Sequence, residues 1–288
     1  MTHMFNHSPG SRPWFQDAPT RSVDVGGTAF VYRELGPRTG VPVILLNHLG
    51  AQLDNFDPRI VDGLAAIRWA IAFDNSGVGA SGGKTPSSIA EMARDAVAFI
   101  RALGFEEVDL FGFSLGGFVA QQIVLTEPKL VRKLILAGTG PAGGEGIDKV
   151  TPLTVVDMIK GALTLRDPKY YLFFTTTPNG HRAANAFLVR LKERRTNRDK
   201  AISLSAFRAQ LKAIKAYGLQ ARQDLSTIDI PTLVANGDQD RMVPSSNTYD
   251  LARRIPGAQL VIYTDAGHGA VFQNHADFVP KALSFLDA

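Results

Sequence analysis

Three residues along this chain have types and surroundings suited to nucleophilic catalysis. Ser114 is at the centre of Gly112-Phe113-Ser114-Leu115-Gly116, between an apolar strand-like run and a helix-like stretch. The glycines allow the sharp strand-to-helix turn that presents a serine hydroxyl as a nucleophile. A serine is a weak nucleophile without a base, and His268, which follows a second strand-like run, is the candidate base. The pattern therefore predicts attack of Ser114 on a carbonyl carbon.

A carboxylate is needed to orient the histidine, and two aspartates compete for that role. Asp238 and Asp240 both follow the apolar run 232–236, in which a strand is expected to begin beside Pro231. Both acids are therefore placed at the carboxyl end of a strand, where a side chain can face an active site. The alternative role for Asp238 is an Asx-type hydrogen bond that shapes the turn.

The chain resembles the α/β-hydrolase superfamily, whose catalytic residues follow one another in the order serine, acid and histidine. The resemblance covers nearly the whole chain, except residues 1–21. The segment 237–244 is similar to the family pattern G-x-x-D-x-x-V-P, and this resemblance places the acid at Asp240. The loop Asn47-His48-Leu49-Gly50 is closer to the enol-lactonase and related esterase subgroup than to the His-Gly-x-Pro dehalogenases. The resemblance implies that the backbone N–H groups of Leu49 and Leu115 form the oxyanion hole.

Further substrate contacts are expected around this site. His48 either touches the substrate or has its ring satisfied by the backbone of its own loop. Four aromatic residues are expected to pack beneath a cap, where some of them line an apolar pocket: Tyr170, Tyr171, Phe173 and Phe174. The remaining histidines lie in terminal or polar stretches and offer little to a catalytic site.

A glycine-rich segment elsewhere matches the dinucleotide-binding pattern G-x-G-x-x-G. Residues 77–82 fit it and follow a strand-like run, but no helix signal begins directly after them. Cofactor binding through this pattern requires a helix whose N-terminus meets the pyrophosphate. The helix signal starts later, where Ser88 and Glu91 form a capping box. The segment resembles the D-x-x-G-x-G-x-S loop of α/β-hydrolases, so it is interpreted as a structural turn, and no cofactor is expected.

The elements around these motifs alternate between strand and helix. Near-continuous apolar runs, such as 43–46 and 134–137, are typical of strands covered on both faces. The sequence predicts an α/β fold with a mostly parallel central sheet of about eight strands, helices on both faces and a helical cap. The predicted limits are 1–21 for an N-terminal extension, 22–144 and 226–288 for the hydrolase core, and 145–225 for the cap inserted in it.

Composition narrows the class of protein. The chain of 288 residues contains no Cys, which excludes disulfides, thiol nucleophiles and cysteine-based metal sites. No apolar run has the length of a signal core or a membrane span, so a cytoplasmic protein without a membrane partner is expected. His268 has no second histidine or carboxylate at metal-ligand spacing, so no metal is expected. Formation of a homo-oligomer is left open.

Charge is distributed unevenly along the chain. Residues 181–222 contain eleven Lys and Arg against two acidic residues, a net charge of +9, whereas the remaining 20 basic and 25 acidic residues give −5. One interpretation is that this basic segment steers an anionic substrate toward the site. The other is an exposed helical face whose charges only keep it solvated. A nucleic-acid partner is not expected, because the segment lacks a recognition motif and interleaved aromatic residues.

These motifs predict a serine hydrolase that cleaves a small-molecule carboxylic ester or lactone through an acyl-enzyme intermediate. A serine at this position disfavours the dehalogenase and epoxide hydrolase branches, which resemble this fold but use Asp there. Carbon–carbon bond hydrolysis and cofactor-free perhydrolysis use a similar triad and stay open. A ligand receptor with the same fold and little turnover also stays open, because fold alone does not fix function.

Overall fold

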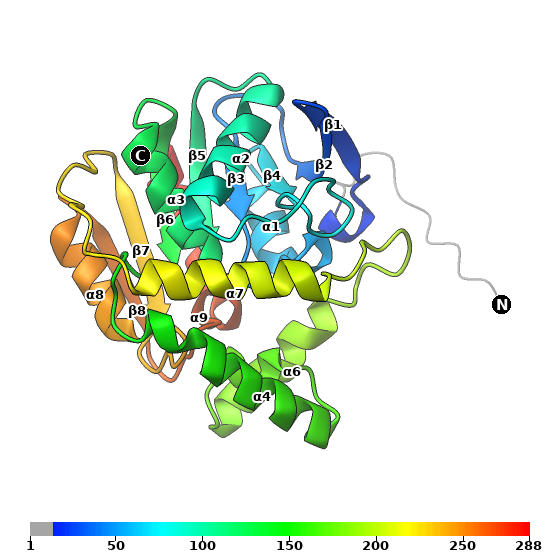
Figure 1. The fold of residues 1–288 in the computed structure, drawn as a ribbon, viewed down its shortest axis with the longest axis vertical. Helices are drawn as coiled ribbons and strands as arrows, with labels where there is room; N and C mark the ends of the chain where they lie inside the picture. The colour runs from blue at the N-terminus through cyan, green and yellow to red at the C-terminus, as the bar shows by residue number, and fades with distance from the viewer. Residues whose placement is uncertain (1–13) are drawn as a thin grey trace.

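The computed structural model describes residues 14–288, and eight strands of this part of the chain form one sheet (Figure 1). The strand order is β1-β2-β4-β3-β5-β6-β7-β8. Strand β2 pairs antiparallel with both neighbours, and all other neighbouring pairs are parallel. The predicted α/β fold with a mostly parallel eight-stranded sheet is therefore confirmed. The strands are β1 (Arg21–Val25), β2 (Thr28–Leu35), β3 (Val43–Leu46), β4 (Ala70–Phe73), β5 (Val108–Phe113), β6 (Val131–Ala137), β7 (Thr232–Gly237) and β8 (Gln259–Tyr263).

The central strands are buried along their whole length because helices cover the sheet. Every residue of β3, β4, β5 and β7 is buried, which explains why segments such as β3 and β4 read as continuous apolar runs instead of alternating ones. Helix α2 packs against α3, and α1 packs against α10. The helices outside the β6–β7 connection are α1 (Pro58–Leu64), α2 (Ile89–Ala102), α3 (Leu115–Thr126), α8 (Ser245–Arg254), α9 (Ala270–Gln273) and α10 (His275–Asp287).

The connection between β6 and β7 is long and helical. It contains the short helix η3 (Ile147–Lys149), then α4 (Val150–Thr164), α5 (Lys169–Leu172), α6 (Pro178–Arg190) and α7 (Leu204–Gly218). Thr177 caps α6 and Ser203 caps α7, each accepting a hydrogen bond from a backbone N–H of the first turn. Figure 1 shows α4, α6 and α7 gathered at one end of the sheet. We call this connection the inserted segment, and its expected limits of 145 and 225 fall in the loops at its two ends.

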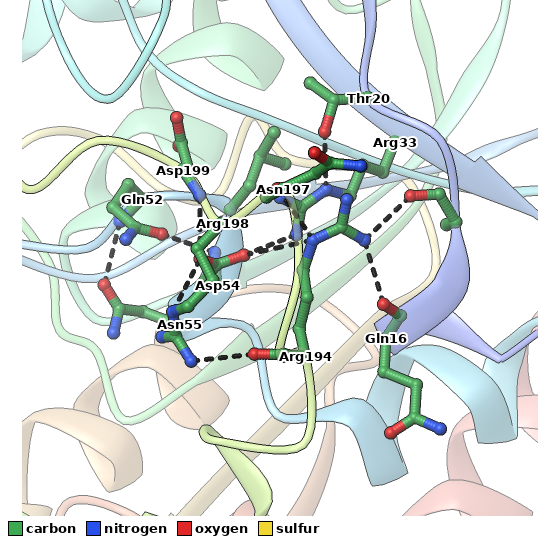
Figure 2. A network of polar contacts seen from close by, with 12 residues as sticks. Gln16, Thr20, Arg33, Gln52, Asp54, Asn55, Arg194, Asn197, Arg198 and Asp199 are labelled. Carbon is green, nitrogen blue, oxygen red and sulfur yellow. Dashed lines mark hydrogen bonds and ion pairs between the residues drawn. The ribbon is translucent and has the colours of Figure 1, made fainter. Parts of the chain in front are cut away.

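Asp54, in the short helix η2 (Leu53–Asn55), connects the inserted segment to the rest of the described chain, which we call the sheet domain. Its side chain is fully buried, and Oδ1 accepts a hydrogen bond of 2.7 Å from Nη1 of Arg33. From the inserted segment, Nε of Arg198 lies 3.4 Å from Oδ2, and the Asp199 N–H donates to the same oxygen over 2.9 Å. Figure 2 shows these groups converging on the carboxylate. The buried charge is thus compensated from both parts of the chain.

A second acid of the same region, Asp57, pairs with Arg190 of α6. Nη2 of Arg190 lies 2.7 Å from Oδ2 and Nε lies 2.9 Å from Oδ1, a bidentate arrangement in which both side chains are largely buried. Arg194 likewise reaches inward, with Nε 3.8 Å from the carboxylate of Asp54. These arginines bind acids of the sheet domain, so the interpretation of the whole basic segment as a solvated face is wrong for them.

The N-terminal part of the described chain is attached to the body of the protein. Phe15, in the short helix η1 (Phe15–Asp17), is buried against Phe56, whereas Trp14 is 54% exposed. Nη1 of Arg194 donates to the carbonyl oxygens of Gln16 and Ala18, each over 2.9 Å. The greater part of the predicted extension, residues 1–13, lies outside the described residues. No helix within 14–288 combines the length and apolarity needed to cross a membrane.

The glycine-rich segment after β4 is a turn. Gly77 and Gly79 have φ of +69° and +58°, in the left-handed region, and helix α2 begins only at Ile89. Ser88 caps that helix by accepting a hydrogen bond from the N–H of Glu91, as the sequence predicts. The segment therefore lacks the directly following helix that dinucleotide binding requires.

Candidate active site

Ser114 is held in a strained backbone conformation between β5 and α3. Its φ of 56° and ψ of −118° lie outside the regions that non-glycine residues ordinarily adopt. The neighbouring glycines are required because other backbone atoms approach them too closely for a side chain to fit. A Cβ at Gly116 would lie 2.1 Å from the carbonyl oxygen of Leu46, and one at Gly112 would lie 2.6 Å from the carbonyl oxygen of Gly116. The sequence thus forces a sharp turn that presents the serine hydroxyl at the carboxyl end of β5.

His268 lies between this hydroxyl and a carboxylate. Its Nε2 is 2.9 Å from Oγ of Ser114, and its Nδ1 is 2.7 Å from Oδ2 of Asp240. The side chains of His268 and Asp240 are completely buried. The structure therefore brings together the three residues that the sequence analysis selected, although they come from three separate loops of the chain.

The two competing aspartates occupy different environments. Oδ1 of Asp240 accepts hydrogen bonds from the N–H groups of Met242 and Val243, at 2.8 and 3.0 Å, which leaves Oδ2 for the histidine. Asp238 is exposed and accepts a hydrogen bond of 3.3 Å from the N–H of Ala266. Its carboxylate therefore shapes the turn, and of the two aspartates it is Asp240 that contacts His268.

The loop after β3 is held in place by side chains. Oδ1 of Asn47 accepts a hydrogen bond of 2.9 Å from the His48 N–H, and the Gly50 N–H donates to Oε1 of Gln210 over 2.8 Å. Within residues 14–288, no acceptor is found for the N–H of Leu49, nor for that of Leu115, the first residue of α3. Both donors are therefore available to a negatively charged oxygen.

The loop that carries His268 is also tied to the inserted segment. The Gly269 N–H donates to the carbonyl oxygen of Phe173 over 2.7 Å, and the rings of Phe173 and His268 meet edge to face with centroids 5.2 Å apart. A change in the position of α5 would therefore alter the position of the loop that carries His268.

A cavity of about 140 Å³ opens beside Ser114, between the loops of the sheet domain and the inserted segment. Its walls are mostly apolar. Of the four expected aromatic residues, Phe173 lines it, whereas Tyr170, Tyr171 and Phe174 do not. The lining residues are His48, Leu49, Gly50, Ser114, Thr154, Met158, Asp167, Pro168, Lys169, Leu172, Phe173, Phe207 and Met242.

The other three aromatic residues pack within the inserted segment. Tyr170 stacks on His181, the hydroxyl of Tyr171 donates to Oγ1 of Thr164, and Phe174 packs on Phe187. The sequence analysis missed Thr154, Met158, Leu172 and Met242 as cavity residues. Helical periodicity places Thr154 and Met158 on one face of α4, but it does not indicate which neighbour that face meets.

His48 is buried, and burial is the main reason that its pKa is lowered to about 3; the nearby positive charge of Lys169 acts in the same direction. Its Nδ1 lies 2.8 Å from the carbonyl oxygen of Leu49. The expectation that backbone of its own loop satisfies the ring is thus met at one nitrogen. Its Nε2 has no hydrogen-bond partner among residues 14–288.

The described residues lack the side-chain groupings that bind metal ions. Residues 14–288 contain no group of three or more His, Cys, Asp or Glu side chains arranged to hold a metal ion.

Known proteins share this architecture. The solved structure of an α/β-hydrolase fold protein from Chitinophaga pinensis has a TM-score of 0.90 and 38% sequence identity, over 96% of this chain and 100% of that one. The enol-lactonase from Burkholderia xenovorans LB400 has the same fold, with a TM-score of 0.76 and 22% identity over 93% of this chain and 100% of that chain.

A relative found by sequence similarity is a hydrolase. The 2-hydroxy-6-oxo-6-(2'-aminophenyl)hexa-2,4-dienoic acid hydrolase of Metapseudomonas resinovorans is 26% identical over 276 residues, which cover 92% of this chain and 90% of that protein. The family model described as alpha/beta hydrolase fold matches residues 41–275. Because its fold, the order of its site residues and this match agree, the chain belongs to the α/β-hydrolase family.

Proposed function

We propose that this hydrolase cleaves a carboxylic ester or lactone by way of an acyl-enzyme formed on Ser114. The observation that carries the proposal is the continuous hydrogen-bonded chain from Ser114 through His268 to Asp240, with distances of 2.9 and 2.7 Å. In such a chain the histidine takes the serine proton during attack, and the carboxylate orients the ring and stabilises the imidazolium that forms.

The oxygen of the attacked carbonyl becomes negatively charged in the tetrahedral intermediate. The N–H groups of Leu49 and Leu115, which have no acceptor within residues 14–288, are the proposed donors to it. A donor of this kind contributes roughly 3 kcal/mol of transition-state stabilisation. Because Gln210 and Asn47 fix the Leu49 loop, this donor is in place before the substrate binds.

Collapse of the first intermediate expels the alcohol, to which the His268 imidazolium gives its proton. A water molecule then loses a proton to His268 and attacks the acyl carbon, and a second collapse returns the free acid and the Ser114 hydroxyl. These steps use only groups of this chain and water. A lactone differs from an ester in that the expelled alcohol stays joined to the acyl group, so deacylation releases a single hydroxy acid.

The inserted segment is the proposed cap of this site. It supplies most of the cavity wall opposite Ser114, including Met158, Leu172 and Phe207, and it contacts the histidine loop through Phe173. A mostly apolar cavity of about 140 Å³ suits a short acyl or alcohol group. Closure by the cap excludes bulk water and strengthens the electrostatic interactions at Ser114.

Three alternatives share this geometry. Carbon–carbon bond hydrolysis is supported by the relative from Metapseudomonas resinovorans, whose name places it in that class. Perhydrolysis would use peroxide in place of water in the second half of the reaction. A ligand receptor would keep the pocket but would not turn over.

A panel of short esters, lactones and vinylogous 1,5-diketones, each assayed with and without hydrogen peroxide, tests the proposal. We expect repeated turnover of esters or lactones, and loss of that turnover in Ser114→Ala. Turnover of the diketones alone would favour carbon–carbon hydrolysis. A peroxide-dependent product would favour perhydrolysis. Acylation that stops after one equivalent would favour the receptor.

A further inference from the structure

His48 is a buried residue of the cavity lining, and its ring contains a hydrogen-bond acceptor without a partner within residues 14–288. Because its Nδ1 lies 2.8 Å from a carbonyl oxygen, which can only accept, Nδ1 must carry the ring proton. In a neutral imidazole the other nitrogen, Nε2, then has a lone pair and accepts. This nitrogen is buried and has no partner within residues 14–288.

The two aromatic neighbours of the ring cannot supply the missing donor. The rings of Phe113 and Phe173 meet His48 edge to face, with centroids at 5.7 and 5.0 Å, and phenyl rings carry no N–H or O–H group. A buried acceptor without a donor is uncommon and calls for an explanation, such as a ligand that completes it. His48 lines the same cavity as the nucleophile Ser114.

A second unpartnered polar atom lines this cavity. Oγ1 of Thr154, on α4 of the inserted segment, is buried and has no partner within residues 14–288. A hydroxyl both donates and accepts, so it can complement a group that itself donates to His48. His48 lies in the loop after β3 and Thr154 in α4, so the two residues line the cavity from different parts of the chain. Two charged side chains also line the cavity, Asp167 and Lys169, and they pair with each other over 3.3 Å; apart from Ser114, the remaining lining side chains are apolar.

We propose that the substrate of this site carries a hydroxyl group that donates a hydrogen bond to Nε2 of His48 and accepts one from Oγ1 of Thr154. This inference rests on the proposed function, since it concerns the substrate of the same Ser114 site. It restricts that substrate to a short hydroxy-substituted ester or lactone. His48 and Thr154 are specificity-determining residues in this assignment, and they take no part in bond cleavage.

Pairs of esters that differ only by CH₃ in place of OH test the assignment. On the acyl side the pair is ethyl butanoate and ethyl 3-hydroxypropanoate, and on the alcohol side it is propyl acetate and 2-hydroxyethyl acetate. We expect kcat/KM to be about tenfold higher for the hydroxyl-bearing member on one of the two sides, the effect of one well-formed hydrogen bond. Methylation of that hydroxyl should abolish the advantage, because the ether cannot donate.

Variants then assign the preference to residues. His48→Phe keeps an aromatic ring but removes the acceptor, and it should bring the ratio of the two kcat/KM values close to one. His48→Gln retains an acceptor oxygen and should restore part of the preference. Thr154→Val removes the hydroxyl with little change of shape and should reduce the ratio several-fold. Since the His48 pKa is about 3, the ratio in the unaltered protein should stay constant from about pH 5 to pH 9.

Two results would overturn the assignment: equal kcat/KM values for both members of both pairs, or a preference that His48→Phe leaves intact. If His48→Phe does not fold, the substrate pairs and Thr154→Val still decide. Failure of the proposed function looks different, because then no ester is turned over or Ser114→Ala retains turnover. Hydrolysis by Ser114 without a hydroxyl preference would reject this inference alone.

Discussion

Asp240 holds His268 with one oxygen while the backbone holds the other. Oδ2 of Asp240 lies 2.7 Å from Nδ1 of His268, and Oδ1 accepts hydrogen bonds from two consecutive N–H groups of its own loop. The carboxylate is completely buried, and these contacts fix its position. The histidine is therefore oriented by a group that is itself unable to rotate.

Replacement of this acid should affect chemistry more than folding. We expect Asp240→Asn to lower kcat by about 10³ to 10⁴, because the amide favours the wrong tautomer of His268. Asp238→Asn is the matched control and should leave kcat within about threefold, since the exposed Asp238 contacts only the turn. Steady-state kinetics on one ester decides between them. A larger loss in Asp238→Asn would transfer the role of the acid to that residue.

The hydroxyl of Ser114 should be the single reactive serine. A fluorophosphonate or sulfonyl fluoride should add one equivalent to the protein, because only this serine is paired with a histidine base among the described residues. Intact-mass measurement and peptide mapping would locate the adduct. Ser246→Ala, which removes an exposed hydroxyl bound to Glu145, should be labelled as readily as the unaltered protein. An adduct at any other serine would contradict the assignment of the nucleophile.

The turn around Ser114 should not tolerate a larger residue after it. We expect Gly116→Ala to destabilise the protein by about 3 kcal/mol or more, because the new Cβ would lie 2.1 Å from the carbonyl oxygen of Leu46. Gly82→Ala is the control, since its nearest atom, Cγ2 of Thr28, lies at 3.3 Å and belongs to a side chain. Urea unfolding would measure both. Similar losses in the two variants would show that close approach at Gly116 is not the cause.

A pair of acids joins the inserted segment to the loop after β4. A Cβ placed on Gly79 would lie 2.2 Å from Oδ2 of Asp74 and 2.3 Å from Oδ2 of Asp199, so these two oxygens are at most 4.5 Å apart, the sum of the two distances. Both oxygens are buried, and a proton on Asp74 would let it donate a hydrogen bond to Asp199. Burial first, and then the neighbouring Asp199, raise the pKa of Asp74 well above its usual range.

This pair should make stability depend on pH. The folded state keeps the proton on Asp74 where the unfolded chain has already lost it, so the free energy of unfolding falls as pH rises from the ordinary pKa of 3.8 to the raised one. Asp74→Asn removes this fall and supplies an amide that can donate to Asp199. The variant should gain on the unaltered protein by up to about 1.4 kcal/mol per pH unit across that window.

Urea unfolding at a series of pH values would measure the difference. Exposed Asp229→Asn is the control and should follow the unaltered protein at every pH. A constant difference between Asp74→Asn and the unaltered protein, independent of pH, would show that the pKa of Asp74 is the same in the folded and unfolded states.

Salt should have little effect on substrate choice. Arg190 and Arg194 of the basic segment are engaged with Asp57 and Asp54, and the cavity itself is mostly apolar. We expect kcat/KM to respond alike to added NaCl for a neutral ester and for a carboxylate-bearing ester of equal size, although salt shortens the screening length to about 8 Å at physiological ionic strength. A decline confined to the anionic ester would instead indicate electrostatic steering by the remaining basic residues.

Local pattern was enough to predict much of this protein. The glycines around Ser114 permit the close approaches that the turn requires, and the strand-like runs at 43–46 and 259–263 coincide with β3 and β8. The order of Ser114, Asp240 and His268 along the chain, together with the strand that precedes each, indicated that their loops meet at one edge of the sheet. The carboxyl ends of parallel strands always share an edge, so this inference needed no knowledge of packing.

Tertiary structure alone decided which side chains meet across elements. It separated buried Asp240 from exposed Asp238, placed Phe173 but not Tyr170 or Tyr171 in the cavity, and paired Arg190 with Asp57 although 133 positions separate them. Periodicity fixes which face of its own helix or strand a residue occupies. Which element packs against that face depends on segments that are distant in the sequence. The residues next to a position in the sequence do not indicate which distant segment that will be.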